Sequence, residues 1–236
     1  MNNSTALVTG ANKGIGKEIA RQLVAAGLTV YVGSRDAGRG QRAVDEIGGD
    51  ARPLLLDVTD DRSIADAARQ VETLDVLVNN AGIMVDGRSA VDADVDSFRS
   101  TYETNLFGVI AVTNAFLPAL RQSTRPRIVN VSSGTGSLAW STGPESRFPA
   151  GSGAAYRSSK TALNALTVFY AQALAGDGFK VNALAPGLRA TDLNERAAAS
   201  AGDPAEGAAG AVRLALLPED GPTGGFFSWD GTAVPW

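Results

Sequence analysis

Short apolar runs alternate along the chain with longer segments in which apolar residues recur at helical spacing. The runs are rich in Val and Leu and are bounded by turn residues, which is typical of buried β-strands. We predict strands at residues 5–9, 28–33, 52–57, 74–82, 126–133 and 179–187, and an edge strand within 224–231. Because nearly every position in these runs is apolar, we expect a parallel sheet that is covered on both faces.

The amphipathic segments between these runs predict helices. We expect helices between Gly16 and Gly27 and at residues 60–74, 94–123, 154–176 and 203–217. The longest contains Pro118 near its end, where we expect the helix to kink or to start again. Strand and helix alternate without a linker, a repeat or a low-complexity tract. The pattern therefore predicts a single α/β domain over residues 1–236, a doubly wound parallel sheet in three layers, which is a Rossmann fold.

Composition narrows the chemistry that the chain can use. Its 236 residues carry 21 basic and 25 acidic side chains without a basic block, so we expect no nucleic-acid partner. The absence of Cys excludes disulfides and thiolate metal sites, and the absence of His removes the commonest acid–base group, so we expect no metal. The N-terminus does not resemble a signal peptide, and no run of about 18 apolar residues occurs. We expect a soluble, cytoplasmic protein without a membrane partner.

Three glycines gather in the stretch TGANKGIG, residues 9–16, directly after the first predicted strand and before the first helix. This is where a Rossmann fold places its phosphate-binding turn. Gly10 allows the tight turn, Gly14 the close approach of a pyrophosphate, and Gly16 close packing of helix on strand. The helix N-terminus adds free N–H groups and partial positive charge. The spacing is G-x-x-x-G-x-G rather than G-x-G-x-x-G, so a plain glycine-rich turn stays open as an alternative.

Further short stretches follow in a definite order. They are NNAG at residues 79–82, NLFG at 105–108, NVSS at 130–133, YRSSK at 156–160 and APG at 185–187. Together with TGANKGIG, they resemble the short-chain dehydrogenase/reductase family over essentially the whole chain. Within that family the chain is most similar to NADPH-dependent carbonyl reductases, because of GANKGIG, SRDAGRG and the closing DGPTGGFFSWDG. The resemblance implies hydride transfer between NADPH and a small-molecule ketone or aldehyde, which gives an alcohol.

The pair Tyr156 and Lys160 stands four residues apart on a predicted helix, so both side chains lie on one face. A phenol with a pKa of about 10 is a poor base at neutral pH. A neighbouring ammonium, helped by the positive charge of an oxidised nicotinamide, lowers that pKa. Reaching about 7 requires roughly 4 kcal/mol, so we expect a partly dry site. In reduction Tyr156 would donate a proton to the carbonyl oxygen.

Two further polar residues complete the predicted catalytic set. Ser133 would hydrogen-bond the same oxygen, and the resemblance selects it over Ser132 as the second serine of the pair. By resemblance, Asn105 holds a water that links Lys160 to solvent. A serine satisfied by backbone and an ordinary helix-interior asparagine are the alternatives.

The end of the second predicted strand favours NADPH over NADH. An NAD enzyme usually places an acid there, whereas this chain has Ser34 followed by Arg35. Arg35 and Lys13 suit a 2′-phosphate, and the resemblance adds Arg39. Asp36 lies near the spacing of a ribose-binding acid, but we expect it to point away and begin the next helix. Solvated surface charges are the alternative reading of the cations.

By resemblance, the rest of the chain supplies the adenine, ribose and nicotinamide contacts, with Asp57 at the adenine ring and Thr191 at the carboxamide. Asp57 is alternatively an ordinary turn former. The full cofactor-binding set that we expect is Gly10, Asn12, Lys13, Gly14, Ile15, Gly16, Arg35, Arg39, Asp57, Val58, Asn79, Ala81, Gly82, Tyr156, Lys160, Pro186, Gly187 and Thr191.

Residues 134–155 look like an insertion between the catalytic serine and tyrosine. Their glycines and prolines disfavour a long helix or a central strand. We predict that the segment folds over the substrate end of the pocket, with Trp140 and Phe148 contacting an apolar part of the substrate. The opposite wall would come from residues 188–202. The alternative is that Trp140 packs into the body or a subunit contact.

Three other functions compete with a reductase. A sensor protein that binds NADP without chemistry has no need of the Asn105, Ser133, Tyr156 and Lys160 set. A sugar-nucleotide epimerase or dehydratase requires a separate substrate domain, for which the chain leaves no room. An NAD-dependent alcohol dehydrogenase would be expected to have an acid, and not a cation such as Arg35, at the end of the second predicted strand. Relatives include homodimers, homotetramers and some monomers, and no interface is evident from the sequence.

Overall fold

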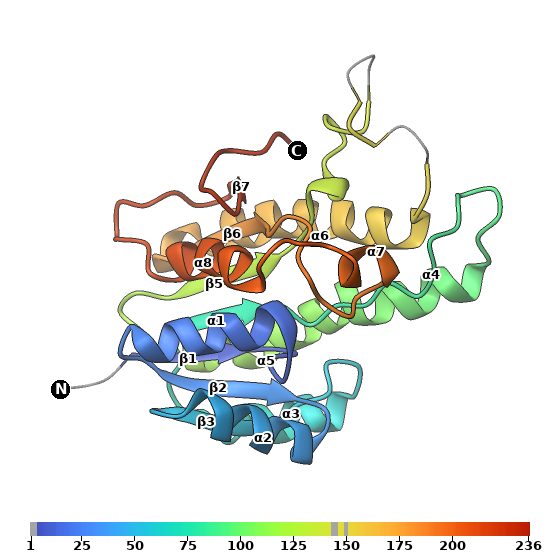
Figure 1. Cartoon of the computed structure of the whole chain (residues 1–236). Helices are drawn as coiled ribbons and strands as arrows, with labels where there is room; N and C mark the ends of the chain where they lie inside the picture. Colours follow the sequence, from blue (N-terminus) through green and yellow to red (C-terminus); the bar gives the residue numbers. More distant parts are fainter. Residues whose placement is uncertain (1–3, 143–145, 149–150) are drawn as a thin grey trace.

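The computed structural model describes residues 4–142, 146–148 and 151–236. Seven parallel strands form one sheet in the order β3-β2-β1-β4-β5-β6-β7, as Figure 1 shows. The strands are β1 (Thr5–Val8), β2 (Thr29–Ser34), β3 (Ala51–Leu55), β4 (Val76–Asn79), β5 (Arg127–Val131), β6 (Lys180–Ala185) and β7 (Phe226–Ser228). All seven lie at or within a residue of the predicted runs, β7 lies at the sheet edge, and the doubly wound fold is confirmed.

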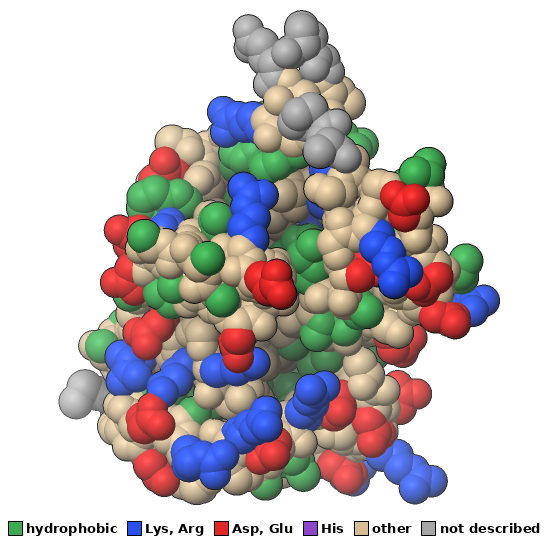
Figure 2. Space-filling model, turned by 45° about the vertical axis from the view of Figure 1, so that its right-hand side comes forward, with side chains coloured by type: hydrophobic (Ala, Val, Ile, Leu, Met, Phe, Trp, Pro, Cys, Tyr) green, Lys and Arg blue, Asp and Glu red, His purple; other side chains and the backbone are tan. Residues whose placement is uncertain are grey.

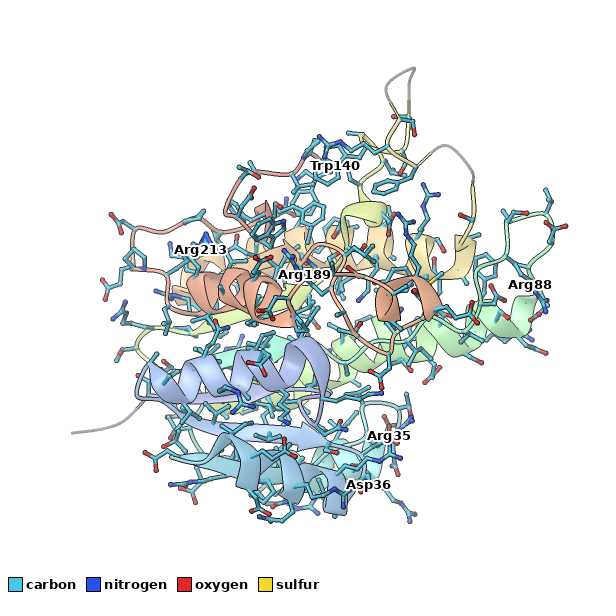
Figure 3. The ribbon with its side chains drawn as sticks, in the orientation of Figure 1. Arg35, Asp36, Arg88, Trp140, Arg189 and Arg213 are labelled. Carbon is cyan, nitrogen blue, oxygen red and sulfur yellow. The ribbon has the colours of Figure 1, made fainter. Side chains whose placement is uncertain are left out.

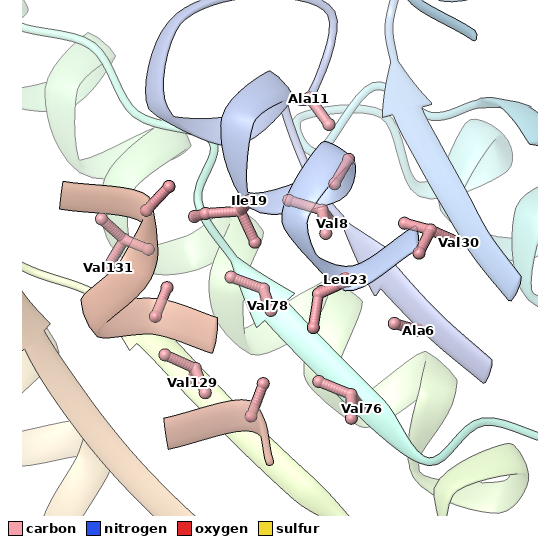
Figure 4. Packing of buried hydrophobic residues seen from close by; sticks show 14 of the residues in the cluster. Ala6, Val8, Ala11, Ile19, Leu23, Val30, Val76, Val78, Val129 and Val131 are labelled. Atoms are coloured by element: carbon pink, nitrogen blue, oxygen red, sulfur yellow. The ribbon is translucent and has the colours of Figure 1, made fainter. Parts of the chain in front are cut away.

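Helices cover both faces of this sheet. The α-helices are α1 (Gly14–Ala25), α2 (Ala37–Ile47), α3 (Asp61–Ala68), α4 (Val95–Tyr102), α5 (Gly108–Leu120), α6 (Ala154–Ala173), α7 (Glu195–Ala198) and α8 (Pro204–Ala215). One apolar cluster joins α1, α2 and α8 to one face of the sheet, and Figure 4 shows its valines and Ile19 interlocked. A second cluster joins α3, α5 and α6 to the other face. Two apolar faces explain why the strands read as continuous apolar runs.

The predicted helix at residues 94–123 is interrupted in the structure. It divides into α4, a π-helical turn η1 (Glu103–Phe107) and α5. The interruption therefore falls at η1, which carries Asn105, whereas Pro118 lies in the last turn of α5. The expected restart at Pro118 is wrong, since α5 runs through that residue, where a proline so near a helix end displaces few backbone hydrogen bonds. The expected kink stays a prediction. Single π-turns inside helices are frequent at functional sites.

The carboxyl ends of β1, β4, β5 and β6 lie at one edge of the sheet. The chain leaves β1 toward β2 on one side and later returns to β4 on the other, which makes this edge a topological switch point. In open α/β sheets, ligands bind in the crevice at such a point. Among the described residues, no helix is long and apolar enough to cross a membrane. The same residues hold no group of three or more acidic, His or Cys side chains fit for a metal.

Candidate active site

Tyr156 and Lys160 lie one turn apart near the start of α6, facing the carboxyl end of β5. The Lys160 Nζ atom lies 5.7 Å from the centre of the Tyr156 ring. It also donates a hydrogen bond of 2.8 Å to the carbonyl of Val131, the last residue of β5. Lys160 is only 4% exposed, while Tyr156 is half-buried. The helix therefore presents both groups to the sheet edge, as the four-residue spacing predicts.

Burial changes the pKa of both groups. Loss of solvent lowers the pKa of Lys160 to about 8. It raises the pKa of Tyr156 to about 12, although the hydrogen bond with Ser133 acts in the opposite direction. The protein alone therefore does not bring the pKa of the phenol toward 7, because desolvation penalises the phenolate more than its neighbours stabilise it. The further lowering expected from an oxidised nicotinamide stays a prediction. The phenol stays protonated at neutral pH, which is the form that can donate a proton.

The two serines at the end of β5 have different surroundings. Ser132 is buried, and its hydroxyl donates to the Asn164 side-chain oxygen at 2.6 Å. Ser133 caps the short 3₁₀ turn η2 (Gly134–Gly136), where its Oγ lies 2.9 Å from the Thr135 hydroxyl and accepts from the Thr135 N–H. The Ser132 hydroxyl is thus committed to packing, whereas that of Ser133 lies next to Tyr156. This placement favours Ser133 as the group that meets a substrate.

Asn105 is fully buried in the π-helical turn η1. Its side-chain oxygen accepts from the Ile83 N–H at 2.8 Å, and its amide donates to the Ile83 carbonyl and to Ser159. A Cβ atom on Gly82 would lie 3.4 Å from both the Asn105 oxygen and the Lys160 Nζ. Asn105 therefore joins η1 to the segment after β4 and lies near Lys160. The water relay remains a prediction.

The glycine-rich turn between β1 and α1 has the shape that a phosphate requires. Gly10 and Gly14 have φ angles of 61° and 55°, a region in which glycine is favoured. A Cβ atom on Gly16 would lie 2.3 Å from the Asn80 amide, so the close helix–strand packing predicted there occurs. Sequence reasoning missed Thr9 and Asn80, which hold this turn: the Thr9 hydroxyl accepts from Asn80 N–H, and the Asn80 amide donates to the carbonyl of Thr9. A glycine turn that is held in place by Thr9 and Asn80 at a helix N-terminus fits the main chain of a pyrophosphate-binding turn.

Cations gather at the adjoining ends of α1 and α2. A surface hollow of about 400 Å³ is lined by Asn12, Lys13, Arg39, Arg42, Ala43, Glu46 and Asp192. Lys and Arg side chains also gather in the lower half of the face in Figure 2, the level at which Figure 1 places α2. The sequence interpretation did not include Arg42, although it stands three residues after Arg39 and thus on the same side of α2. The positive charge and the hollow fit an anionic group.

The end of β2 is followed by one exposed cation and one acid that caps a helix. Arg35 follows the strand and is exposed. Asp36 is the N-cap of α2, and its side chain accepts from the Arg39 N–H at 2.7 Å. The expectation that Asp36 begins the next helix is confirmed. Figure 3 labels Arg35 and Asp36 at this end of the sheet.

Two residues expected at the adenosine use their side chains inside the fold. The amide of Asn79 donates to Asn130 and to Thr113, at 2.9 and 3.1 Å, and is buried among them. Its side chain is therefore directed away from the glycine turn, and only its main chain is left to border a ribose. Asp57 accepts from both the N–H and the hydroxyl of Thr59, which is the turn-forming role named as its alternative.

The other adenosine-side residues are divided between packing and the edge of the site. Ile15 and Val58 are half-buried against the two apolar clusters. Ala81 donates its N–H to the Thr9 hydroxyl at 3.0 Å, beside Gly10. A Cβ on Gly10 would lie 3.0 Å from the Cα of Ala81. The NNAG segment thus packs directly on the glycine turn.

On the other side of the crevice, the turn after β6 is held by a buried cation that the sequence interpretation missed. Arg189 donates to the Pro186 carbonyl at 2.8 Å and pairs with Glu206 at 2.7 Å. Its guanidinium lies 4.3 Å from the centre of the Trp229 ring, and Figure 3 shows it directed inward. Gly187 has a φ of 77°. Further along, the Thr191 methyl group lies 3.3 Å from where a Gly14 Cβ would be, so this segment reaches the glycine turn.

Trp140 and Phe148 occupy a segment that packs on the body. Residues 143–145 and 149–150 of the predicted 134–155 insertion lie outside the described residues. Trp140 is half-buried against a small apolar cluster of β6 and β7, and Arg147 covers its ring at 4.0 Å. A Cβ on Gly134 would lie 2.8 Å from the indole, so the ring adjoins the residue after Ser133. Phe148 lies 5.6 Å from the Arg157 guanidinium.

Part of this segment also borders α6 on the side away from Tyr156 and Lys160. A second hollow, of about 510 Å³, is lined by Thr135, Leu138, Ser141, Gly151, Ala154, Arg157, Ser158, Thr161, Ala162 and Ala165. The α6 members of this set stand on the face opposite Tyr156 and Lys160. The contacts of Trp140 with the β6–β7 cluster and with Arg147 directly support its packing alternative, while its contact with a substrate remains a prediction.

Known proteins resemble the chain in sequence and in fold. The family model described as short chain dehydrogenase matches residues 4–201. Salutaridine reductase of Papaver bracteatum is 33% identical, over 94% of this chain and 93% of that protein. (+)-Neomenthol dehydrogenase of Arabidopsis thaliana is 37% identical, over 94% and 95%. The crystal structure of NADPH-bound carbonyl reductase from chicken fatty liver has a TM-score of 0.85 at 27% identity and covers 100% of both chains.

The matches extend over the crevice and not only over the sheet. The residues matched by the family model include the glycine turn, the serines at the end of β5, Tyr156 and Lys160 on α6 and the turn after β6. The chain therefore belongs to the short-chain dehydrogenase family and is a carbonyl reductase-like oxidoreductase.

Proposed function

We propose that this protein reduces a ketone or an aldehyde to an alcohol, with NADPH as the reductant and Tyr156 as the proton donor. One observation carries the proposal: a protonated phenol, a buried amine and a serine hydroxyl meet at the carboxyl end of β5, next to the glycine turn. The carbonyl reductase from chicken fatty liver, whose fold this chain shares, binds NADPH.

The glycine turn and the cations beside it are suited to hold the cofactor. Gly10 and Gly14, with positive φ, and Gly16, with no space for a Cβ, form the tight turn at the N-terminus of α1 on which a pyrophosphate would bind. Arg35, exposed after β2, and Arg39, which lines the hollow, would bind the 2′-phosphate, and Arg42 adds a further positive charge to the hollow. When bound, NADPH supplies the hydride that reaches the carbonyl carbon.

The side chains of the protein handle the proton and the oxygen. Ser133 donates a hydrogen bond to the carbonyl oxygen, with Thr135 orienting its hydroxyl. Tyr156 gives its proton to that oxygen, so one NADPH and one proton yield the alcohol and NADP⁺. Lys160 stabilises the phenolate that this leaves and, with a pKa near 8, is able to pass a proton back to it.

The substrate would lie between the segment that carries Trp140 and Phe148 and the turn after Gly187. The indole adjoins Gly134, directly after Ser133, which supports Trp140 as a wall of the pocket. The cytoplasmic location expected from the sequence stays a prediction, as does assembly into a homodimer or a homotetramer like those of relatives.

A panel of ketones and aldehydes tests the proposed reaction. NADPH consumption is followed with each compound, and the same compounds are tried with NADH. We expect turnover with NADPH and a markedly weaker rate with NADH. Tight NADPH binding without consumption on any compound would instead support a sensor protein, and equal use of both cofactors would contradict the assignment of the cations.

A further inference from the structure

An ion pair closes the crevice at its outer rim. The Nζ of Lys13, in the glycine turn, lies 2.6 Å from the Asp192 carboxylate, which stands 179 residues further along the chain. Next to this pair, Thr191 packs on Gly14. The segment after β6 is thus held to the turn that precedes α1, and the pair spans the site in which we place the cofactor.

The cation that pairs with Asp192 is also one that we expect to bind the cofactor. Lys13 is expected to bind the 2′-phosphate of NADPH, and Asp192 lines the same hollow as Arg39 and Arg42. The other carboxylate of that hollow, Glu46, is paired with Lys17 on α1. Asp192 is therefore the carboxylate lining this hollow whose ion-pair partner is a cation expected at the phosphate; Asp36, outside the lining, lies 3.9 Å from Arg39.

We propose that Asp192 is a specificity-determining residue that limits the preference of this enzyme for NADPH over NADH. Its carboxylate pairs with Lys13 and thereby weakens the attraction between the cations of the hollow and a 2′-phosphate. The binding of a 2′-hydroxyl, which is uncharged, is little affected. The inference rests on the proposed placement of the 2′-phosphate.

The electrostatics of the hollow support this role. The hydrogen bond from Lys13 holds the pKa of Asp192 below its usual value, with a smaller contribution from Arg39, so the carboxylate is charged at neutral pH. Both side chains are more than half exposed. Such a pair gives little stability by itself, so an anion with two or more charges is able to compete for its cation. When the anion takes Lys13, the Asp192 carboxylate stays nearby without its partner, and its negative charge repels the anion at close range.

Asp192→Asn tests the proposal without changing the size of the side chain. The dissociation constants of NADPH and NADH are measured directly by fluorescence titration, so the readout does not depend on a substrate. Loss of the ion pair also removes a contact between the two walls of the crevice, which changes the binding of both cofactors equally. The ratio of the NADPH and NADH dissociation constants cancels that shared change. We expect the preference for NADPH to rise about two- to fivefold, the size of one surface ion pair.

Asp45→Asn is the matched control. Asp45 lies on α2, accepts a hydrogen bond from Gln41 and is not part of the hollow, so the same change of charge should leave the ratio unaltered. A ratio that stays the same or falls in Asp192→Asn, while Lys13→Ala lowers it, would overturn the role of Asp192. If Lys13→Ala and Arg39→Ala both leave the ratio unchanged, the 2′-phosphate does not bind here and the placement in the proposed function fails as well.

Discussion

The Lys160 amine lies 5.7 Å from the centre of the Tyr156 ring, and neither group is accompanied by a charged partner of opposite sign among its described hydrogen bonds. Burial opposes ionisation of both, so the protein alone keeps the phenol protonated. The arrangement is suited to giving a proton to a substrate that becomes more basic as hydride arrives.

Replacing the phenol should stop the reaction and spare the cofactor site. Tyr156→Phe removes the proton donor but keeps the ring, so we expect turnover to fall by at least about 100-fold, the low end for acid–base catalysis. The dissociation constant of NADPH should change little. Tyr170→Phe is the control, because Tyr170 is on the same helix and its hydroxyl only donates to Asn114. A Tyr156→Phe enzyme that turns over near the wild-type rate would rule out the mechanism.

Cofactor preference should depend on Arg35. A charge-assisted hydrogen bond is worth about 1.5–3 kcal/mol, so Arg35→Ala should raise the Michaelis constant for NADPH about tenfold or more and hardly alter that for NADH. Arg52→Ala on the neighbouring strand β3 removes an equally exposed charge away from the site and serves as control. An equal loss with both cofactors would show that Arg35 acts on the fold rather than on the 2′-phosphate.

The glycine at the start of α1 should tolerate no side chain. A Cβ on Gly16 would lie 2.3 Å from the Asn80 amide and 2.7 Å from the Gly10 carbonyl, which is backbone and cannot move aside easily. We expect Gly16→Ala to lower the free energy of unfolding by about 1–3 kcal/mol and to weaken NADPH binding. Gly176→Ala, where a Cβ meets nothing within 4 Å, should be close to neutral in both measurements. A fully stable Gly16→Ala protein would contradict the tight packing.

We expect Lys160 to lower the free energy of unfolding at neutral pH. Its folded pKa of about 8 lies below the ordinary 10.5, a difference worth about 3 kcal/mol. Between these values the unfolded chain binds more protons, so the penalty is complete below about pH 8 and disappears as the pH rises toward 10.5. Lys160→Met also leaves the Val131 carbonyl without its donor, at roughly 1–3 kcal/mol.

The net expectation for Lys160→Met is an inactive protein that is about 1–2 kcal/mol more stable than the wild type at pH 7. Urea unfolding of both proteins at several pH values between 7 and 10 checks this. The advantage of the variant should shrink steadily as the pH rises. A difference that does not vary with pH would mean that Lys160 titrates normally.

Trp140 should affect both stability and substrate choice. Trp140→Ala removes a half-buried ring beside Gly134, so we expect a loss of about 1–3 kcal/mol and a changed order of preference among carbonyl substrates. NADPH affinity should be unchanged. Trp236→Ala is the control, because that indole stacks on Phe226 of the same cluster. Lower stability with an unchanged order of preference would leave Trp140 a packing residue only.

The sequence alone located the strands of the sheet, most of the helices and the helix face that Tyr156 and Lys160 share. A strand buried on both faces must be apolar at nearly every position, so its location is encoded locally. The spacing of Tyr156 and Lys160 places them on one helix face for the same reason, and the glycines before α1 mark the turn through backbone conformation. Each of these features depends on residues that are close together in the chain.

Tertiary structure decided what no local pattern contains. The break between α4 and α5 falls at the buried Asn105 rather than at Pro118, because the Asn105 amide pairs with Ile83 across the fold. The pKa of Tyr156 rises instead of falling, since desolvation depends on everything packed around the phenol. Lys13 pairs with Asp192 only when the turn before α1 and the segment after β6, which are far apart in the sequence, come together in the fold. The burial of a side chain and its distance from other charges depend on segments that are far apart in the sequence, so they are set only once the chain has folded.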